Sequence, residues 1–219
     1  MSEEAAKKRR TQAERSAETR ARMLEATVRC LREKGYAATT TLLVAEQAGV
    51  SRGAMLHQFP TKVDLMLFVV REVYRDELRA YARLLGAFPD DRARLSAIPE
   101  VVWQVLSRPA GVAVLEIMLG SRSDPVLAER LGPLQQEIEA DSFTQVRSYE
   151  RALGREIPAS YIRLVVWAVR GLSIAQMLTD DPGGIEDSVR FLRQLLDANF
   201  ASLSTQAETS KTETPKTEI

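Results

Sequence analysis

Cysteine and histidine are almost absent from this chain of 219 residues, which has one of each. A single cysteine, Cys30, cannot form an intrachain disulfide, and this agrees with a reducing compartment. One histidine and one cysteine, with no metal-ligand spacing and no glycine-rich phosphate loop, leave little for catalysis. We therefore expect a protein that is not an enzyme and that holds no metal or other cofactor.

Net charge and long apolar runs are lacking as well. The 30 Lys and Arg residues balance 30 Asp and Glu residues, which argues against a protein that coats nucleic acid along its whole surface. No apolar run approaches the ~18 residues of a membrane span, and the N-terminus lacks the apolar segment of a signal peptide. We expect a cytoplasmic protein with no membrane partner.

The charges are distributed unevenly along the chain. Residues 1–60 hold more Lys and Arg than Asp and Glu, whereas the remainder is mildly acidic. This asymmetry indicates that only one end of the protein meets a polyanion. The basic run "KKRR" from Lys7 to Arg10 fits either an arm that reaches into a DNA minor groove or a solvated chain end.

Signals for β-strands are also scarce, while apolar residues recur at helical spacing nearly everywhere, so the sequence predicts an all-α fold. The composition divides the chain into four predicted parts. These are a flexible basic arm over 1–16, a small three-helix domain over 17–64, a helical body over 65–204 and a disordered tail over 205–219.

Capping residues set the helix boundaries that are expected near the N-terminus. Thr40 and Ser51 are predicted N-caps of two short helices, and Gly49 separates them. Thr61 and Asp64 have the spacing of a capping box that opens a long helix. Two helices of about two turns cannot close a core unaided, so they must pack on the helix that precedes them.

The stretch "VAEQAGVSRGAMLHQF", from Val44 to Phe59, has the pattern of a helix-turn-helix DNA reader. Met55 and Phe59 are four residues apart and are predicted to face the core. The residues expected to meet DNA lie on the opposite face or at helix starts, and they are Thr40, Thr41, Ser51, Arg52, Gly53, Ala54, Leu56, His57 and Lys62.

Each of these residue types suits a different part of a duplex. Arg52 can pair with guanine or rest on a phosphate, and Gly53 and Ala54 allow the backbone to come close. Hydroxyls and the Lys62 ammonium suit phosphate oxygens. His57 fits a phosphate contact, a catalytic base or a plain surface residue. Its position in the motif favours the phosphate contact, and a base would need a convergent partner that the sequence does not imply.

Residues 19–67 resemble the DNA-binding domain of the TetR family of bacterial transcription regulators. The Gly35-Tyr36 corner, "AEQAGVS" and "FPTK" all fall in register with that family. The resemblance implies a homodimer that binds a near-palindromic double-stranded operator and represses until a small apolar or amphipathic molecule enters the C-terminal domain. The sequence departs from the family pattern at Leu56, where a phosphate-contacting tyrosine is usual, and at Gln58, often a histidine.

The resemblance also implies an effector pocket between the body helices. The residues assigned to it, some of which could equally be plain core, are Trp103, Met118, Arg122, Phe143, Arg147, Trp167 and Gln176.

The last two helices are expected to carry broad apolar stripes with Val169, Leu172, Leu192 and Leu196. These stripes are either buried within the monomer or paired with a second copy in a four-helix bundle. Two other functions stay open on the sequence alone, a ligand-independent architectural protein and an activator.

Overall fold

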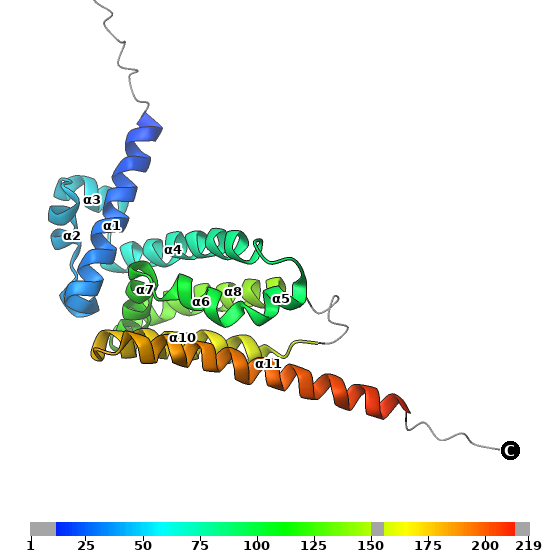
Figure 1. Cartoon of the computed structure of the whole chain (residues 1–219). Helices are drawn as coiled ribbons and strands as arrows, with labels where there is room; N and C mark the ends of the chain where they lie inside the picture. Colours follow the sequence, from blue (N-terminus) through cyan, green and yellow to red (C-terminus); the bar gives the residue numbers. More distant parts are fainter. Residues whose placement is uncertain (1–11, 150–155, 213–219) are drawn as a thin grey trace, which may run out of the picture. The chain divides into compact units, whose positions relative to one another are not determined.

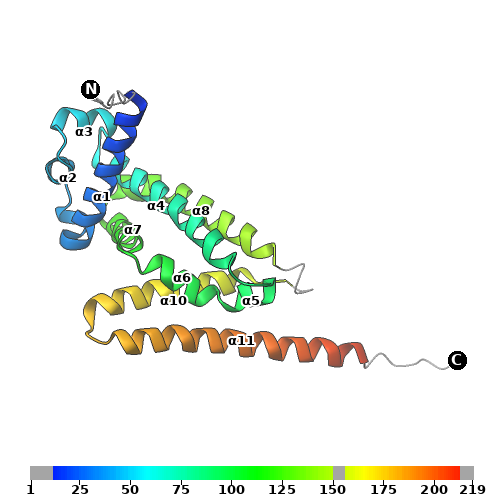
Figure 2. The same cartoon turned by 45° about the horizontal axis from the view of Figure 1, so that its top comes forward.

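The computed structural model describes residues 12–149 and 156–212, and within them every regular element is helical (Figures 1 and 2). The predicted all-α class is thereby confirmed. The elements in chain order are α1 (Gln12–Ala38), α2 (Thr41–Ala48), α3 (Arg52–Gln58), α4 (Lys62–Leu85), α5 (Asp91–Ser96), α6 (Ile98–Leu106), α7 (Pro109–Gly120), the 3₁₀ turn η1 (Ser121–Ser123), α8 (Pro125–Arg147), α10 (Ala159–Leu178) and α11 (Pro182–Thr212).

The contacts divide the chain into two compact units whose limits differ from the predicted domains. The first unit runs to Val73 and takes in Ala113–Gly132, and the second comprises Tyr74–Val112 and the described residues from Pro133 onward. The first unit extends past the predicted limit at 64 because α4 packs within it. The Phe68 ring, for example, lies 4.7 Å from that of Phe59.

The ends of the chain also depart from expectation. The predicted arm over 1–16 overlaps α1, which begins at Gln12, and residues 1–11 lie outside the described part. The tail predicted to be disordered from 205 is helical as far as Thr212, because α11 continues into it.

The helix caps predicted for the first unit are present. The hydroxyl of Thr40 accepts a hydrogen bond from the Leu43 N–H, and that of Ser51 accepts one from the Ala54 N–H. Thr61 and Asp64 bond reciprocally, since each backbone N–H donates to the other side chain. These local bonds satisfy donors that a helix leaves free in its first turn, which explains why the sequence located the helix starts correctly.

A glycine with positive φ interrupts the first helix, and another caps the end of the second. Gly49 has φ 62° and caps α2, with its N–H bonded to carbonyls of the last turn. Gly35 has φ 73° and ψ 175° and interrupts α1 before Tyr36, so the chain turns there and continues to Ala38. Residues with a side chain rarely adopt a positive φ of this kind, which accounts for glycine at both positions.

The second unit is built around α6, α10 and α11. Its core includes Val101 and Val102 from α6 and Val165 and Val169 from α10. In Figures 1 and 2, α10 and α11 lie side by side along most of α10. Among the described residues, α10 is long and apolar enough to cross a membrane, and the bent pair α6–α7 passes the same composition test. Val165 and Val169 are nevertheless fully buried, as in the core helix of a globular unit.

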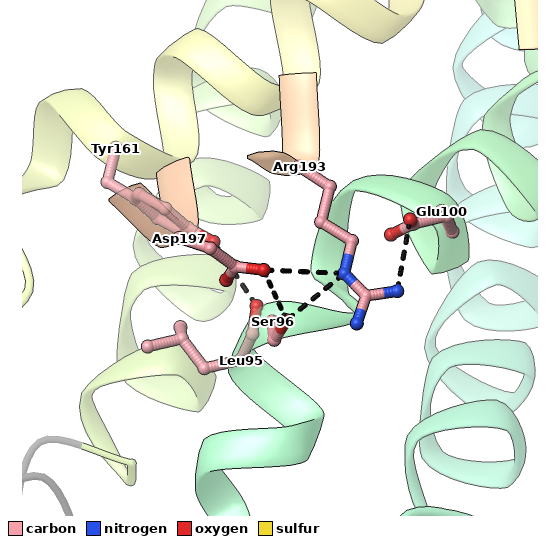
Figure 3. A network of polar contacts seen from close by, with 6 residues as sticks. All are labelled: Leu95, Ser96, Glu100, Tyr161, Arg193 and Asp197. Carbon is pink, nitrogen blue, oxygen red and sulfur yellow. Dashed lines mark hydrogen bonds and ion pairs between the residues drawn. The ribbon is translucent and has the colours of Figure 1, made fainter. Parts of the chain in front are cut away.

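Polar contacts attach α11 to α5 and α6 (Figure 3). Ser96 Oγ donates to Asp197 Oδ2 at 2.8 Å and accepts from Arg193 Nε at 3.1 Å. Arg193 Nη1 also lies 3.3 Å from Glu100 Oε1. Because these contacts come from one side of α11, they fix which of its faces points away from the unit.

Candidate nucleic-acid interface and ligand cavity

The two faces of α3 differ as the helix-turn-helix pattern predicts. Met55 and Phe59 are 1% and 5% exposed and belong to the core of the first unit, which confirms their predicted orientation. On the outer face Arg52, Gly53 and His57 are exposed. One arginine, one glycine and one imidazole thus lie on a single exposed surface within seven residues of helix, which is a composition suited to a DNA groove.

The remaining predicted contact residues lie around this surface with different degrees of exposure. Thr40 and Ser51 are exposed, while Thr41 and Ala54 are half-buried. The Thr40 and Ser51 hydroxyl oxygens accept backbone hydrogen bonds. Their O–H groups can still donate to a phosphate oxygen, because a hydroxyl both accepts and donates.

Gly53 is not required by the fold. Its φ is not positive, and a Cβ placed on it would meet no atom nearer than the Ser51 Oγ, at 4.0 Å. Glycine inside a helix is less favourable than alanine by about 1 kcal/mol. An exposed glycine that neither the backbone nor the packing requires is typical of a position where another molecule approaches the helix closely.

Leu56 leaves an apolar side chain on the outer face of α3, 39% exposed, and Leu42 on α2 is 59% exposed. Neither can donate a hydrogen bond to phosphate. An exposed leucine on a groove-facing helix can instead contact the methyl group of thymine.

Lys62 differs from the other predicted DNA contacts, because its ammonium makes contacts within the protein. Lys62 Nζ donates to the Tyr36 carbonyl oxygen at 2.6 Å and lies 3.8 Å from the centre of the Tyr36 ring. Burial lowers the pKa of this ammonium, and the nearby Asp124 carboxylate acts in the opposite direction. Lys62 therefore has an internal role, and because an ammonium has three N–H donors, its contact with phosphate stays a prediction.

Tyr36 joins this lysine to a distant part of the sequence. Its hydroxyl donates to Asp124 Oδ2 at 2.6 Å, and this bond lowers the pKa of the Asp124 carboxyl. The ring packs so closely on Gly120 that a Cβ placed there would lie 2.3 Å from the ring. Nearby, Arg130 and Asp64 form an ion pair at 2.9 Å. The end of α1, the start of α4 and the α7–η1–α8 turn are thereby held together within the first unit.

The second unit contains an apolar cavity with a volume of about 70 Å³. Helices α4, α6, α8 and α10 all contribute to its wall. The lining residues are Leu78, Tyr81, Leu85, Ile98, Val101, Val102, Ser142, Val146, Tyr149, Ile162, Val165 and Val166.

None of the seven residues predicted to line a pocket lines this cavity. Trp103 and Phe143 pack, partly buried, against the core of the second unit. Met118 and Arg122 belong to the first unit. The others lie elsewhere in the second unit, where Trp167 and Gln176 are exposed and Arg147 borders a separate polar hollow beside Glu156.

Sequence reasoning missed a buried polar group next to the cavity. Glu77 Oε1 and Arg170 Nη1 are inaccessible to solvent and have no hydrogen-bond partner. Burial raises the pKa of Glu77 to about 7, against the lowering effects of Arg170 and Arg108. A spacing signal was available, because Glu77 precedes Tyr81 by one helical turn and a glutamate on an apolar helix face is unusual.

Apolar side chains also form an exposed stripe on α10 and α11. Trp167 is 52% and Leu195 is 53% exposed, and Leu164 and Phe191 are exposed to a similar extent. Val169, which was expected on a stripe buried either within the monomer or against a second copy, is fully buried within the unit. Both faces of α10 are apolar, and only the packing shows which of them the unit itself buries.

Known proteins resemble this chain in sequence and in structure. The family model for bacterial regulatory proteins of the tetR family matches residues 23–69. The HTH-type transcriptional regulator CymR of Pseudomonas putida is 32% identical over 180 residues, which cover 80% of this chain and 87% of CymR. An uncharacterized HTH-type transcriptional regulator of Mycobacterium tuberculosis is 28% identical over 193 residues, covering 87% and 99% of the two chains.

Two solved structures share the fold. A TetR-family regulator from Rhodococcus superposes with a TM-score of 0.67 at 19% identity, covering 84% of this chain and 99% of that chain. A regulator from Saccharomonospora viridis in complex with choline gives a TM-score of 0.63 at 21% identity, covering 84% and 97%.

The helical fold and the exposed α3 of the helix-turn-helix define a DNA-binding transcription regulator. The match to CymR extends over most of both chains. The chain belongs to the TetR family of bacterial transcriptional regulators.

Proposed function

We propose that this regulator is a homodimeric repressor that leaves its operator when a small apolar or amphipathic molecule enters the cavity of the second unit. The observation that carries this proposal is the continuity of α4. The helix begins with the capping box directly after α3 and ends with Tyr81 and Leu85 in the cavity wall. A displacement of its second half can therefore reach the DNA-binding unit through one continuous helix.

The size of the cavity supports a change of shape on binding. Pockets that enclose drug-sized ligands measure roughly 300–1,000 Å³, whereas this cavity measures about 70 Å³. A ligand must separate the surrounding helices to enter. A ligand that binds the separated state better shifts the population towards it. The choline complex of the Saccharomonospora viridis protein supports a small-molecule site in this fold.

Operator recognition is proposed to rest on α3, with the hydroxyls of Thr40, Thr41 and Ser51 on phosphates and Arg52 on a base edge. Ala54 and Leu56 would contact bases through apolar groups, and His57 would contact phosphate. The exposure of Arg52, Leu56 and His57 on one face supports this arrangement.

The test of base reading is Arg52→Ala, measured on DNA fragments that the purified protein retains from genomic DNA. We expect a loss of ~1–3 kcal/mol on the preferred operator and a flattened preference at one base pair of each half-site. The exposed Arg83 of α4 provides a control of equal charge, and Arg83→Ala should leave base preference intact. A uniform loss on all sequences after Arg52→Ala would instead make Arg52 a phosphate contact.

Gly53→Ala is expected to change the stability of the fold and the affinity for the operator in opposite directions. We expect the variant to be as stable as the wild type or more stable, by up to about 1 kcal/mol, because alanine favours the helix and its methyl group meets open space. Operator affinity should fall, since the methyl group lies where the duplex would approach. Urea unfolding and operator titration of the same preparation measure the two effects. Unchanged affinity would remove Gly53 from the interface.

Thermal shift measurements distinguish the alternative of a ligand-independent architectural protein. A repressor with an effector is stabilised by mass action when its ligand is present, and an architectural protein is not. Loss of operator binding in the presence of the same molecule would separate repression from activation.

A further inference from the structure

Two buried polar side chains lie one helical turn from residues that line the cavity of the second unit. On α4, Glu77 precedes the lining residues Tyr81 and Leu85 by one and two helical turns. On α10, Arg170 follows the lining residues Ile162 and Val166 in the same way. Residues four apart lie on the same face of a helix, so Glu77 and Arg170 extend two walls of the cavity.

Tyr81 on α4 and Val166 on α10 line the same cavity, so Glu77 and Arg170, each one helical turn from one of them, lie close to it. Tyr81 lines the cavity, and the pKa of its hydroxyl is raised by burial and by Glu77, while Arg170 acts in the opposite direction. The pKa of the Glu77 carboxyl responds to Arg170 in turn. The carboxylate and the guanidinium therefore lie near one another at the Tyr81 end of the cavity.

The two side chains do not satisfy one another. Among the described residues no ion pair joins Glu77 to Arg170, and Glu77 Oε1 and Arg170 Nη1 are both buried without a hydrogen-bond partner. Unsatisfied buried polar atoms are unfavourable, more so when the group is charged. A bound molecule that offers a donor to Oε1 and an acceptor to Nη1 would relieve both atoms at once.

The charge of the site restricts the chemistry of that molecule. A cationic head would pair with an ionised Glu77 but would be repelled by Arg170 and by Arg108, which both act on that carboxyl. An anionic head would pair with Arg170 but would be repelled by Glu77 whenever that carboxyl is ionised. A head without charge that both donates and accepts satisfies both atoms without repulsion. It also suits either protonation state of Glu77, because a hydroxyl or an amide can accept a hydrogen bond from a protonated carboxyl.

We propose that the effector is a slim apolar molecule with one uncharged head that is both a donor and an acceptor, such as an alcohol or a primary amide, held between Glu77 and Arg170. This inference rests on the proposed function of the cavity as the effector site. It adds the class of head group and the two residues that select it.

The test compares the binding of four probes to the full-length protein. The probes 1-hexanol, hexanamide, hexanoate and hexylammonium share a chain of six carbon atoms, which includes the carbonyl carbon of the amide and the carboxylate. Dissociation constants are measured by isothermal titration calorimetry. We expect the alcohol and the amide to bind about tenfold more tightly than either charged probe, the difference expected for one satisfied buried polar group. The double variant Glu77→Met with Arg170→Met should lose this preference while still binding the apolar body. Arg147→Met, at an exposed arginine outside the cavity wall, should retain the preference.

A variant that fills the cavity shows where the probes bind. Val166 is half-buried in the wall, so Val166→Phe can direct its extra volume partly to solvent, and it should abolish binding of all four probes. Circular dichroism melting checks that it folds.

Tightest binding of hexylammonium or of hexanoate would overturn the head-group inference and assign selection to Glu77 or to Arg170 alone. Equal binding of all four probes would overturn that inference and leave the cavity intact as an effector site. Absence of binding by every probe would overturn the assignment of the cavity as the effector site, and with it the proposed function.

Discussion

Trp167→Glu is expected to convert the proposed homodimer to monomers, because Trp167 lies on the exposed stripe of α10 and α11 that we propose as the dimer interface. Trp167 is exposed on α10 beside Leu164, and Phe191 and Leu195 continue the apolar stripe on α11. In an interface with twofold symmetry each substitution occurs twice. Burial of an unpaired carboxylate costs several kcal/mol, so the dimer dissociation constant should rise by roughly a thousandfold or more.

Light scattering coupled to size exclusion, over a range of concentrations, measures this change directly. Operator affinity should fall with it, because a monomer reaches one half-site only. Gln136→Glu is a matched control, since it adds the same charge at an exposed position of α8, which is not part of the stripe. A Trp167→Glu variant that remains a dimer with full operator affinity would contradict the proposed interface.

A charge at Leu196 tests the stability of the second unit and not the dimer interface. Leu196 is half-buried and packs against the core of the second unit, on the inner side of α11. Leu196→Glu should therefore lower the free energy of unfolding of the unit before it affects assembly. Chemical unfolding separates the two positions, because only the Leu196 variant should be strongly destabilised.

The second large effect expected is a loss of stability between pH 5 and pH 8 that depends on Glu77. Burial raises the pKa of this carboxyl to about 7 from its ordinary 4.5. The facing charges are Arg170 on α10 and Arg108 after α6, which lower the pKa, and Asp76 on α4 itself, which raises it. The folded state therefore binds the proton more tightly than the unfolded state.

The sign of the effect follows from proton linkage. The stabilisation is fully present below pH 4.5 and is lost as the pH rises through about 7. A shift of this size corresponds to up to about 3 kcal/mol. Glu77→Gln should remove most of the loss, as measured by urea unfolding at several pH values. The carboxyls of Asp64 and Asp124 have lowered pKa values and act in the opposite direction at lower pH, so the comparison stays above pH 5.

Glu137→Gln is the control for this measurement, because it changes the net charge equally at an exposed position of α8. It should retain the pH dependence of the wild type. If Glu77→Gln also retains that dependence, then another group carries the linkage, and the buried carboxylate described here is ionised without penalty.

The sequence by itself determined the features that depend on neighbours within one or two helical turns. The caps at Thr40, Ser51 and Thr61 follow from single side chains bonding to backbone groups three residues away. The inward orientation of Met55 and Phe59 follows from the period of the helix. The family pattern between residues 23 and 69 consists of these same local signals.

Only the tertiary structure decided the roles that depend on residues far apart in the chain. Lys62 was predicted to meet phosphate, and no local signal indicated the Tyr36 ring that lies beneath it or the Asp124 carboxylate bonded to that tyrosine. The wall of the cavity comes from four helices, and helical spacing within any one of them does not identify the others.

The same reason applies to α10, which is apolar on more than one face. Its periodicity gives the faces but not their partners, so Val169 was expected on a stripe in the monomer or at an interface, and Trp167 was assigned to the effector pocket. The packing of α6 and α11 buries Val169 and leaves Trp167 exposed. Local hydrogen bonds and helical period are encoded residue by residue, whereas burial is decided by whichever surfaces the whole chain brings together.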